Sequence, residues 1–236
     1  IKIKFGRSVA EYCWTCTPAL LLYILKEFQE AIITYLDADL YFFSDPSPIF
    51  DEFGNNSILI TEHNFTPKYD QADISGKYNV QFITIRNDLN GIACLEWWKK
   101  KCLEWCFARL EDGKYGDQRY LEQWPDLFKG TYVLKHPGSG IAPWNVNNYQ
   151  NFDNIIFYHF HGLSMYKDSF DICRGYNIND NVKEIIYLPY LNKLRNAEKK
   201  LLSYDFDIRD IYVKKNMLKD FCRTKRHQAC SPVLDS

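Results

Sequence analysis

Two aspartates one residue apart, Asp37 and Asp39, are the residues whose spacing most directly suggests chemistry. They follow residues 31–36, a short apolar and β-branched run that predicts a buried strand. Side chains two residues apart on an extended segment point to the same side, so both carboxylates can face one point. Converging carboxylates repel each other unless a proton or a cation lies between them. The pair therefore predicts a site for a hard divalent cation such as Mg²⁺ or Mn²⁺, at a strand end where α/β sheets bind ligands.

The same spacing occurs a second time, at Asp205 and Asp207. That pair lies in a charged stretch with no buried strand leading into it, so we interpret it as surface. The alternative for Asp37 and Asp39 is a turn that carries two solvated carboxylates.

The elements that must position the aspartates alternate between helical and extended patterns, which is typical of a mixed α/β fold. Residues 8–11 fit a capping box, and Thr17 followed by Pro18 predicts a second helix start. An apolar helical stripe follows, formed by Leu20, Leu21, Ile24, Leu25 and Phe28. Further strands are predicted in 57–63, 78–88, 131–136 and 154–160, and further helices in 87–113, stopped by Gly113, and in 182–202, with Pro189 near its beginning.

Composition excludes several classes of protein. The 236 residues carry a net charge of -1, so no global field attracts nucleic acid or an acidic membrane. No apolar run approaches the roughly 18 residues of a membrane span, and no signal-peptide pattern opens the chain. The basic segment 222–236 predicts a disordered tail or, at most, a peripheral membrane contact.

The 8 cysteines indicate reduced thiols in a cytoplasmic protein. Cys13 and Cys16 have the C-x-x-C spacing of zinc and redox sites. No second such pair completes a zinc site in the sequence, so ordinary packing is the preferred interpretation.

The segment "YLDADLYFFSDPSPIF", residues 35–50, resembles the metal-binding DXD segment of GT-A-fold glycosyltransferases. It is most similar to the galactinol synthase, glycogenin and LPS-galactosyltransferase group and to the nucleotide-diphospho-sugar transferases. Four later stretches resemble motifs of this group in the same order, so the resemblance covers about residues 8–162. They are "YNVQFITIRND" at 78–88, "GDQRYLEQW" at 116–124, "APWN" at 142–145 and "HFHG" at 159–162.

The resemblance implies a GT-A-like, Rossmann-like mixed sheet flanked by helices. The sequence ahead of Asp37 is shorter than the nucleotide-binding strand and helix of such a domain, so the first strand–helix unit could be missing. We expect a catalytic domain over residues 1–170 and a C-terminal helical extension, residues 171–236, packed on it.

By the same resemblance, Asp37, Asp39 and His159 would be the metal ligands, with Mn²⁺ favoured over Mg²⁺ because imidazole suits it better. His161 shares a strand face with His159 and would contact phosphate or a ligand residue. The alternative is a pair of strand histidines hydrogen-bonded near a sheet edge.

The remaining motif residues would bind the donor sugar in the family resembled. Asn79 and Gln81 lie on the strand in 78–88, although the family often has glycine at the second position. Asp117 and Gln118 would orient the sugar as catalytic residues, and Asp117 could also cap a helix. Trp144 could stack on a sugar face, while a core tryptophan is the default.

One departure concerns the donor phosphates. The family has lysine three residues after the glycine of its H-F-x-G motif, and Met165 stands there, with Lys167 nearby.

The resemblance implies a metal-dependent glycosyltransferase that moves a sugar from a nucleotide-diphosphate donor to a hydroxyl on a saccharide or lipid-linked saccharide, with retention of the anomeric configuration as the expected outcome. An inverting enzyme would need a base, for which Asp117 or Glu62 could serve. The pathway expected is cell-surface polysaccharide or LPS biosynthesis, in the cytoplasm or at the inner face of the membrane. The alternatives are a non-catalytic protein that binds nucleotide sugars or carbohydrate, and a nucleotidyltransferase with a related sheet.

Overall fold

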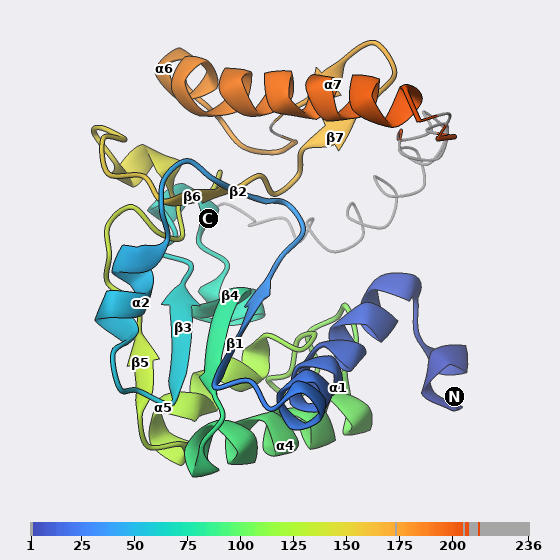
Figure 1. Cartoon of the computed structure of the whole chain (residues 1–236), viewed down its shortest axis with the longest axis vertical. Coiled ribbons are helices and arrows are strands. Elements are labelled where there is room, and N and C mark those ends of the chain that lie inside the picture. The colour runs from blue at the N-terminus through green and yellow to red at the C-terminus, as the bar shows by residue number, and fades with distance from the viewer. Residues whose placement is uncertain (1, 173, 205, 208–211, 213–236) are drawn as a thin grey trace, which may run out of the picture. The chain divides into compact units, whose positions relative to one another are not determined.

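A computed structural model describes residues 2–172, 174–204, 206–207 and 212 of the chain (Figure 1). The chain divides into two compact units, Ile1–Phe160 and His161–Ser236, which we describe separately. The predicted domain boundary at residue 170 stays a prediction. Asp205 and the tail 222–236 lie outside the described residues, and Asp207 is exposed.

A mixed four-stranded sheet organises the first unit. Its order is β1 (Ile32–Leu36), β4 (Tyr78–Arg86), β3 (Ile58–Glu62) and β5 (Thr131–Val133). The strand β4 runs antiparallel to both of its neighbours, β1 and β3, whereas β3 and β5 are parallel. The prediction of a mixed sheet flanked by helices in an α/β fold is confirmed.

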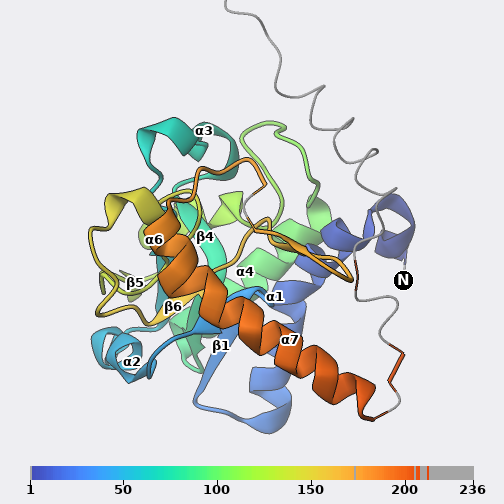
Figure 2. The same cartoon turned by 90° about the horizontal axis from the view of Figure 1, so that it is seen from above.

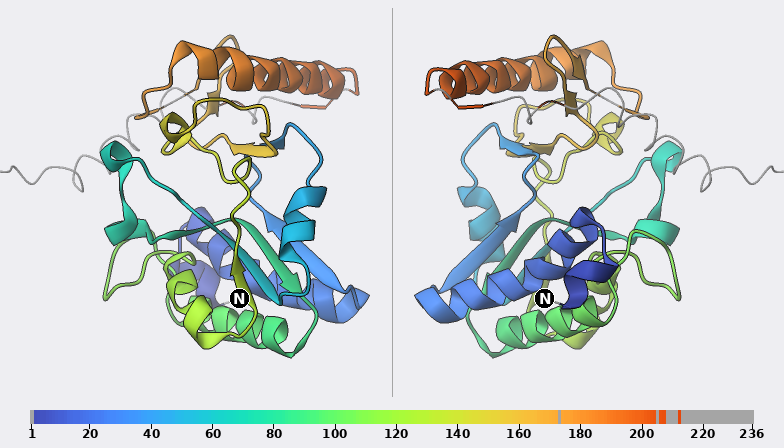
Figure 3. Two further views of the ribbon diagram at one scale, coloured as in Figure 1. Left: turned by 90° about the vertical axis from the view of Figure 1, so that its left-hand side faces the viewer. Right: turned by 90° about the vertical axis from the view of Figure 1, so that its right-hand side faces the viewer.

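Helices cover both faces of this sheet. The helices α1 (Val9–Phe28) and α4 (Leu89–Glu104) bury their apolar sides in one core with β3 and β4 (Figure 3). The short helix α2 (Ser47–Phe53) packs with Leu59 and Phe82 on the opposite face. The strands thus feed two separate cores, one on each face, which explains why β3 and β4 are buried in nearly continuous runs.

The helix α1 begins at the predicted capping box: Ser8 Oγ accepts from Glu11 N, and Glu11 Oε2 accepts from Ser8 N. The predicted second start at Thr17 and Pro18 is wrong, because one helix continues through both residues. The hydroxyl of Thr17 donates to the carbonyl of Cys13, one turn earlier, inside that helix.

The predicted apolar stripe on α1 is only partly right. Leu21 and Leu25 are buried, and Leu22 joins them in the core. Leu20 and Phe28 are 56% and 64% exposed. The buried side of the helix is therefore rotated by about one residue from the expected stripe.

The strand β1 forms as predicted but is not buried. Among the described residues it pairs only with β4, so it is an edge strand of the sheet. Ile32 and Leu36, at its two ends, are 36% and 42% exposed. An apolar, β-branched run therefore does not distinguish an edge strand from a central one.

The helix α4 is shorter than the predicted 87–113 and ends at Glu104, so Gly113 is not its stop. The guanidinium of Arg7 donates to the carbonyls of Cys102 and Leu103 and so caps the last turn. Trp105 and Cys106 are buried beyond the helix end, which explains why the helical spacing of apolar residues seemed to continue.

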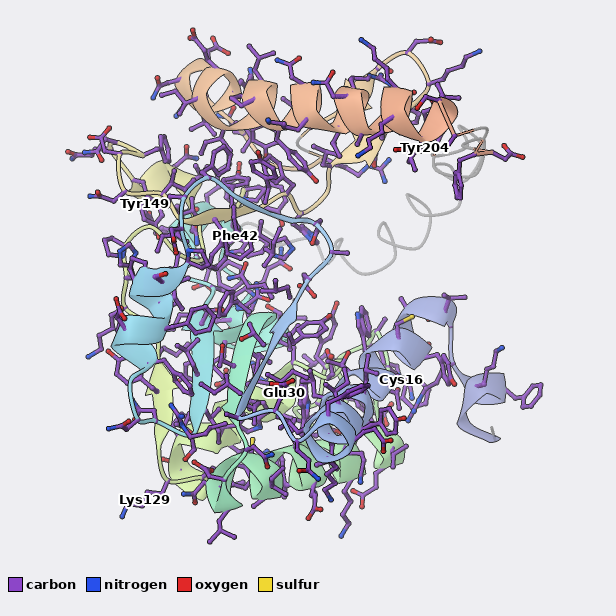
Figure 4. All side chains as sticks on the ribbon, viewed as in Figure 1. Cys16, Glu30, Phe42, Lys129, Tyr149 and Tyr204 are labelled. Carbon is purple, nitrogen blue, oxygen red and sulfur yellow. The ribbon has the colours of Figure 1, made fainter. Side chains whose placement is uncertain are left out.

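A second, two-stranded sheet pairs β2 (Leu40–Phe42) with β6 (Phe157–His159). The side chain of Phe42 packs on Phe157, with ring centroids 5.5 Å apart (Figure 4). The shorter helical segments of this unit are η1 (Lys2–Gly6), η2 (Pro67–Tyr69), α3 (Ala72–Ser75), η3 (Arg119–Gln123), α5 (Trp124–Leu127) and η4 (Val146–Asn148).

The second unit contains a small hairpin and a helical extension. The hairpin strands are β7 (Ser164–Met165) and β8 (Phe170–Asp171). The extension runs through α6 (Asp180–Val182), the π-helical turn η5 (Lys183–Tyr187) and α7 (Leu188–Leu202), and Figure 2 shows it as one rod. This confirms a C-terminal helical segment, which begins two residues earlier than predicted. Within the part of the chain that the structure describes, no helix is both long and apolar enough to span a bilayer.

Candidate functional site

The pairing of β2 with β6 brings together side chains from two segments that are far apart in sequence. Leu40 lies opposite His159 in this pairing, and Phe160 N donates to Asp39 O at 2.9 Å. As a result, His159 Nε2 lies 3.0 Å from Asp39 Oδ1 and 3.9 Å from Asp37 Oδ2. We call Asp37, Asp39 and His159 the acidic cluster.

The contact made by the second ring nitrogen of His159, Nδ1, sets the orientation of the ring. His159 Nδ1 lies 2.9 Å from the side-chain oxygen of Gln81, and an amide oxygen can only accept, so Nδ1 carries the proton. The lone pair of Nε2 in the neutral ring then faces the two carboxylates. Three such groups around one point attract a proton or a cation. The set of two oxygens and one imidazole nitrogen suits Mn²⁺.

Asp37 is held by the strand that precedes it and by the neighbouring strand. Its Oδ1 accepts from the Tyr35 hydroxyl at 2.8 Å, and its backbone N–H donates to Gln81 O at 2.9 Å. Burial raises the pKa of Asp37 above its usual value, as does Asp39, whereas His159 and the Tyr35 hydroxyl lower that pKa. Sequence reasoning missed Tyr35, although residues 35 and 37 share the alternation of an extended chain. The predicted alternation does not continue to Asp39, because residues 38 and 39 form a turn in which Leu40 N donates to Asp37 O at 3.2 Å.

A bulge in β4 lies beside the acidic cluster. The register between β3 and β4 shifts between Leu59 and Thr61, which leaves β4 backbone groups unpaired with β3. Asn79 Oδ1 accepts from Gln81 N at 2.9 Å. Gln118 Oε1 accepts a hydrogen bond from Val80 N at 3.4 Å. Two residues predicted to orient the donor sugar thus satisfy the backbone of the bulge.

The Gln118 side chain has a further bond: its Nε2 donates to the carbonyl of Ser75 at 2.8 Å. Asp117 is 3% exposed, and its backbone carbonyl accepts from Trp98 Nε1 at 2.8 Å. Burial, with the nearby Cys106 and Asp37, holds the pKa of Asp117 well above its usual range. Asp117 does not cap a helix, because the segment after it is the 3-10 helix η3, whose N-cap is Gln118 without a side-chain bond.

Trp144 and Asn145 fasten the loop after β5 to the end of β3. Trp144 Nε1 and Asn145 Nδ2 both donate to His63 O at 2.8 Å. The Trp144 ring meets the His159 ring edge to face, with centroids 5.2 Å apart, and is itself buried. Trp144 therefore packs against a residue of the acidic cluster.

Two other residues considered from the sequence have contacts of their own. Glu62 Oε1 pairs with Lys77 Nζ at 3.0 Å. His161 is the exposed first residue of the second unit, where its ring contacts that of Tyr176. Cys13 and Cys16 are free thiols on α1, and Figure 4 labels Cys16.

Comparison with known proteins gives two relatives in Bacillus subtilis (strain 168). No family model matches the chain. The uncharacterized protein YfnD is 33% identical over 236 residues, which cover 93% of this chain and 76% of YfnD. The uncharacterized protein YfnF is 36% identical over 181 residues, which cover 69% of this chain and 60% of YfnF. The chain thus spans less than two thirds of the length of YfnF.

Two solved structures show a partial likeness. One is a glycosyltransferase involved in the glycosylation of the major capsid of PBCV-1, with a TM-score of 0.46 and 12% identity over 66% of this chain and 73% of that chain. The other is the glycosyltransferase GlyE of Streptococcus pneumoniae TIGR4, with a TM-score of 0.39 and 19% identity over 61% of this chain and 36% of that chain.

The sequence relationship is the stronger of these likenesses, because it extends over nearly the whole chain. With 33% identity over 93% of its length and 76% of the relative, this chain belongs to the same protein family as YfnD.

Proposed function

We propose that this protein is a metal-dependent glycosyltransferase that moves a sugar from a nucleotide-diphosphate donor to a hydroxyl acceptor. One observation carries the proposal: the lone-pair side of His159 and the carboxylates of Asp37 and Asp39 converge, with 3.0 Å and 3.9 Å between Nε2 and the nearest oxygens. The order of the sequence motifs around these residues supports the same activity.

Asp37, Asp39 and His159 would hold Mn²⁺ or Mg²⁺, and their donor set fits such a cation. When bound, the cation would neutralise negative charge that develops on the departing diphosphate. The protein's own part is to present these groups in fixed positions, which the Tyr35 hydroxyl and the Gln81 amide do for Asp37 and His159.

Asp117 would bind the donor sugar. Because its pKa is held well above the usual range, the carboxyl favours its protonated form, which can donate a hydrogen bond to a sugar oxygen. Asn79 and Gln118 would shape this subsite by fixing the β4 bulge, and Trp144 would form its apolar wall. His161 would contact the donor phosphates.

We propose retention of anomeric configuration, on the basis of the sequence resemblance, and the anomer of the product tests it directly. Inversion would require a carboxylate base. Asp117 suits that task poorly, because burial favours its neutral form, and Glu62 is paired with Lys77. We further propose a saccharide or lipid-linked saccharide as the acceptor, in the synthesis of cell-surface polysaccharide or LPS at the inner face of the membrane.

The decisive experiment measures release of nucleoside diphosphate from a panel of nucleotide sugars, with Mn²⁺ and with EDTA. We expect Mn²⁺-dependent cleavage of one donor and its loss in Asp37→Ala. Asp207→Ala is the matched control, because Asp207 belongs to a motif of the same spacing and is exposed. Binding of a donor without cleavage would favour the non-catalytic binding protein, and equal cleavage with EDTA would refute the metal role.

A further inference from the structure

We infer that Gln81 is a positioning residue that fixes two metal ligands at once, Asp37 through its backbone and His159 through its side chain. This inference rests on the proposed function. It gives Gln81 a different task from the donor contact predicted from the sequence. It also gives a reason for glutamine at a position where the family resembled often has glycine.

The two contacts run in different directions from the same residue. Gln81 O accepts from Asp37 N at 2.9 Å, which continues the pairing of β4 with β1 past the end of the strand. Gln81 Oε1 lies 2.9 Å from His159 Nδ1 on β6. Gln81 therefore joins the loop that carries the aspartates to the strand that carries the histidine.

The amide of Gln81 is itself held in one orientation. Its side chain is fully buried, and its Nε2 donates to Thr61 Oγ1 on β3 at 3.3 Å. Its backbone N–H donates to Asn79 Oδ1 at 2.9 Å. A Cβ built on Gly140 would come within 3.3 Å of Gln81 Nε2, so the loop after β5 closes the space beside the amide. Because Gln81 Nε2 donates to Thr61, the amide oxygen of Gln81 is the atom that faces His159.

The consequence is a fixed tautomer. An amide oxygen at Nδ1 keeps the proton on that nitrogen and leaves Nε2 to bind a cation together with the carboxylates. Gln81→Leu would keep the backbone bond to Asp37 and remove only the side-chain contacts, to His159 and to Thr61. The side-chain part of the inference can therefore be tested alone.

The test measures Mn²⁺ affinity by electron paramagnetic resonance of free Mn²⁺, and imidazole coordination by electron spin echo modulation from ¹⁴N. We expect Gln81→Leu to weaken Mn²⁺ binding by about 10–100-fold and to reduce the nitrogen modulation. Gln81→Glu keeps an acceptor oxygen for Nδ1 and should restore most of the affinity. Thr61→Val keeps the Gln81 amide but removes the acceptor of its Nε2. This variant should lose up to about tenfold in Mn²⁺ affinity.

Thr84→Val is the matched control, because it removes a buried hydrogen bond to Thr34 from the same strand, away from the acidic cluster. It should keep wild-type Mn²⁺ affinity. Wild-type affinity in both Gln81→Leu and Thr61→Val would overturn the inference, and Thr61→Val decides the matter if the leucine variant does not fold. If the wild-type protein binds no Mn²⁺, the metal role in the proposed function fails as well. If it binds Mn²⁺ and cleaves a donor while the variants match it, only the role of Gln81 is refuted.

Discussion

The first unit contains two polar clusters that each join distant segments of the chain, and they differ in what completes them. The acidic cluster brings residues 37, 39 and 159 together. The second, which we call the Arg7 cluster, consists of Arg7, Thr15, Cys102, Leu103 and Cys106 and joins the start of α1 to the end of α4.

In the Arg7 cluster the chain supplies both sides of each interaction. The guanidinium of Arg7 donates to Thr15 Oγ1 at 2.8 Å and to the carbonyls of Cys102 and Leu103. The Cys106 thiol has hydrogen bonds with Cys102 and Thr15. These bonds and the nearby charge of Arg7 lower the pKa of Cys106, whereas burial raises it. The positive charge of Arg7 therefore already occupies the position to which a bound cation would otherwise be attracted.

In the acidic cluster the groups that face one another are two carboxylates and an imidazole. The residues around it, Tyr35 and Gln81, fix the directions of these groups without adding a positive charge. The comparison teaches that burial and long-range contacts alone do not mark a functional site. Under the proposed function, what would mark it is a set of two carboxylates and an imidazole held in fixed directions, whose charge a bound cation would balance.

The largest effect should come from breaking the acidic cluster itself. We expect Asp39→Asn to lower Mn²⁺-dependent donor cleavage by about 10²–10³-fold or more, because the charge of the leaving group is then poorly balanced. Its free energy of unfolding without metal should stay within about 1 kcal/mol of wild type, since Asp39 is partly exposed. Initial rates and urea unfolding in EDTA measure the two effects. A variant that unfolds instead of losing turnover would make this cluster structural, like the other.

A smaller effect, on stability alone, is expected from the Arg7 cluster. Arg7→Met leaves the carbonyls at the end of α4 and the Thr15 hydroxyl without their donor, and should lower the free energy of unfolding by about 1–3 kcal/mol. Mn²⁺ affinity should not change. Lys26→Met is the control, because Lys26 pairs with Glu96 on an exposed surface and should cost about 0–1 kcal/mol. A loss of Mn²⁺ binding in Arg7→Met would end the distinction between the clusters.

The last effect appears only when the pH changes and concerns Asp117, which lies close enough to both clusters for Cys106 and Asp37 to affect it. Its pKa in the folded state is raised, so its contribution to stability is complete below the unfolded pKa of about 3.9 and is lost as the pH rises through the folded value. Between about pH 4 and pH 8, the free energy of unfolding of Asp117→Asn should therefore fall less steeply with pH than that of wild type. The two slopes should differ by at most about 1.4 kcal/mol per pH unit.

Urea unfolding in EDTA across this pH range measures the effect. Asp73→Asn, which changes an exposed aspartate, should keep the wild-type pH dependence. If Asp117→Asn kept it as well, the proposed protonated form of Asp117 would lose its support.

Much of the fold could be predicted from local patterns. The capping box at Ser8 started α1. The apolar run of β3 and the alternating, β-branched segment of β4 formed buried strands, because these signals depend on neighbouring residues only. The end of α4 could not be predicted, since it depends on Arg7, nearly one hundred residues earlier. The exposure of β1 was also hidden, because it depends on the order of strands in the sheet.

The candidate site divides in the same way. The sequence pointed to Asp37 and Asp39 through the alternation of an extended chain, and motif order pointed to His159. The alternation is wrong beyond Asp37, because residues 38 and 39 form a turn in which Leu40 N donates to Asp37 O at 3.2 Å. The contacts of Gln81, Asn79 and Gln118 depend on a bulge in β4, and the sequence pattern carries no sign of that register shift. Whether these residues also touch a donor stays a prediction.

The pairing of β2 with β6 has a consequence for the order in which the chain is assembled during synthesis. Leu40 and His159 lie opposite each other although more than one hundred residues separate them, so this pairing closes a long loop. The ribosome delivers the aspartates early, and β1 can pair with β4 once residue 86 has emerged. The histidine arrives only with the last strand of the first unit. A nascent chain would therefore acquire its central sheet first, and the proposed cation site would be assembled only when the unit is complete.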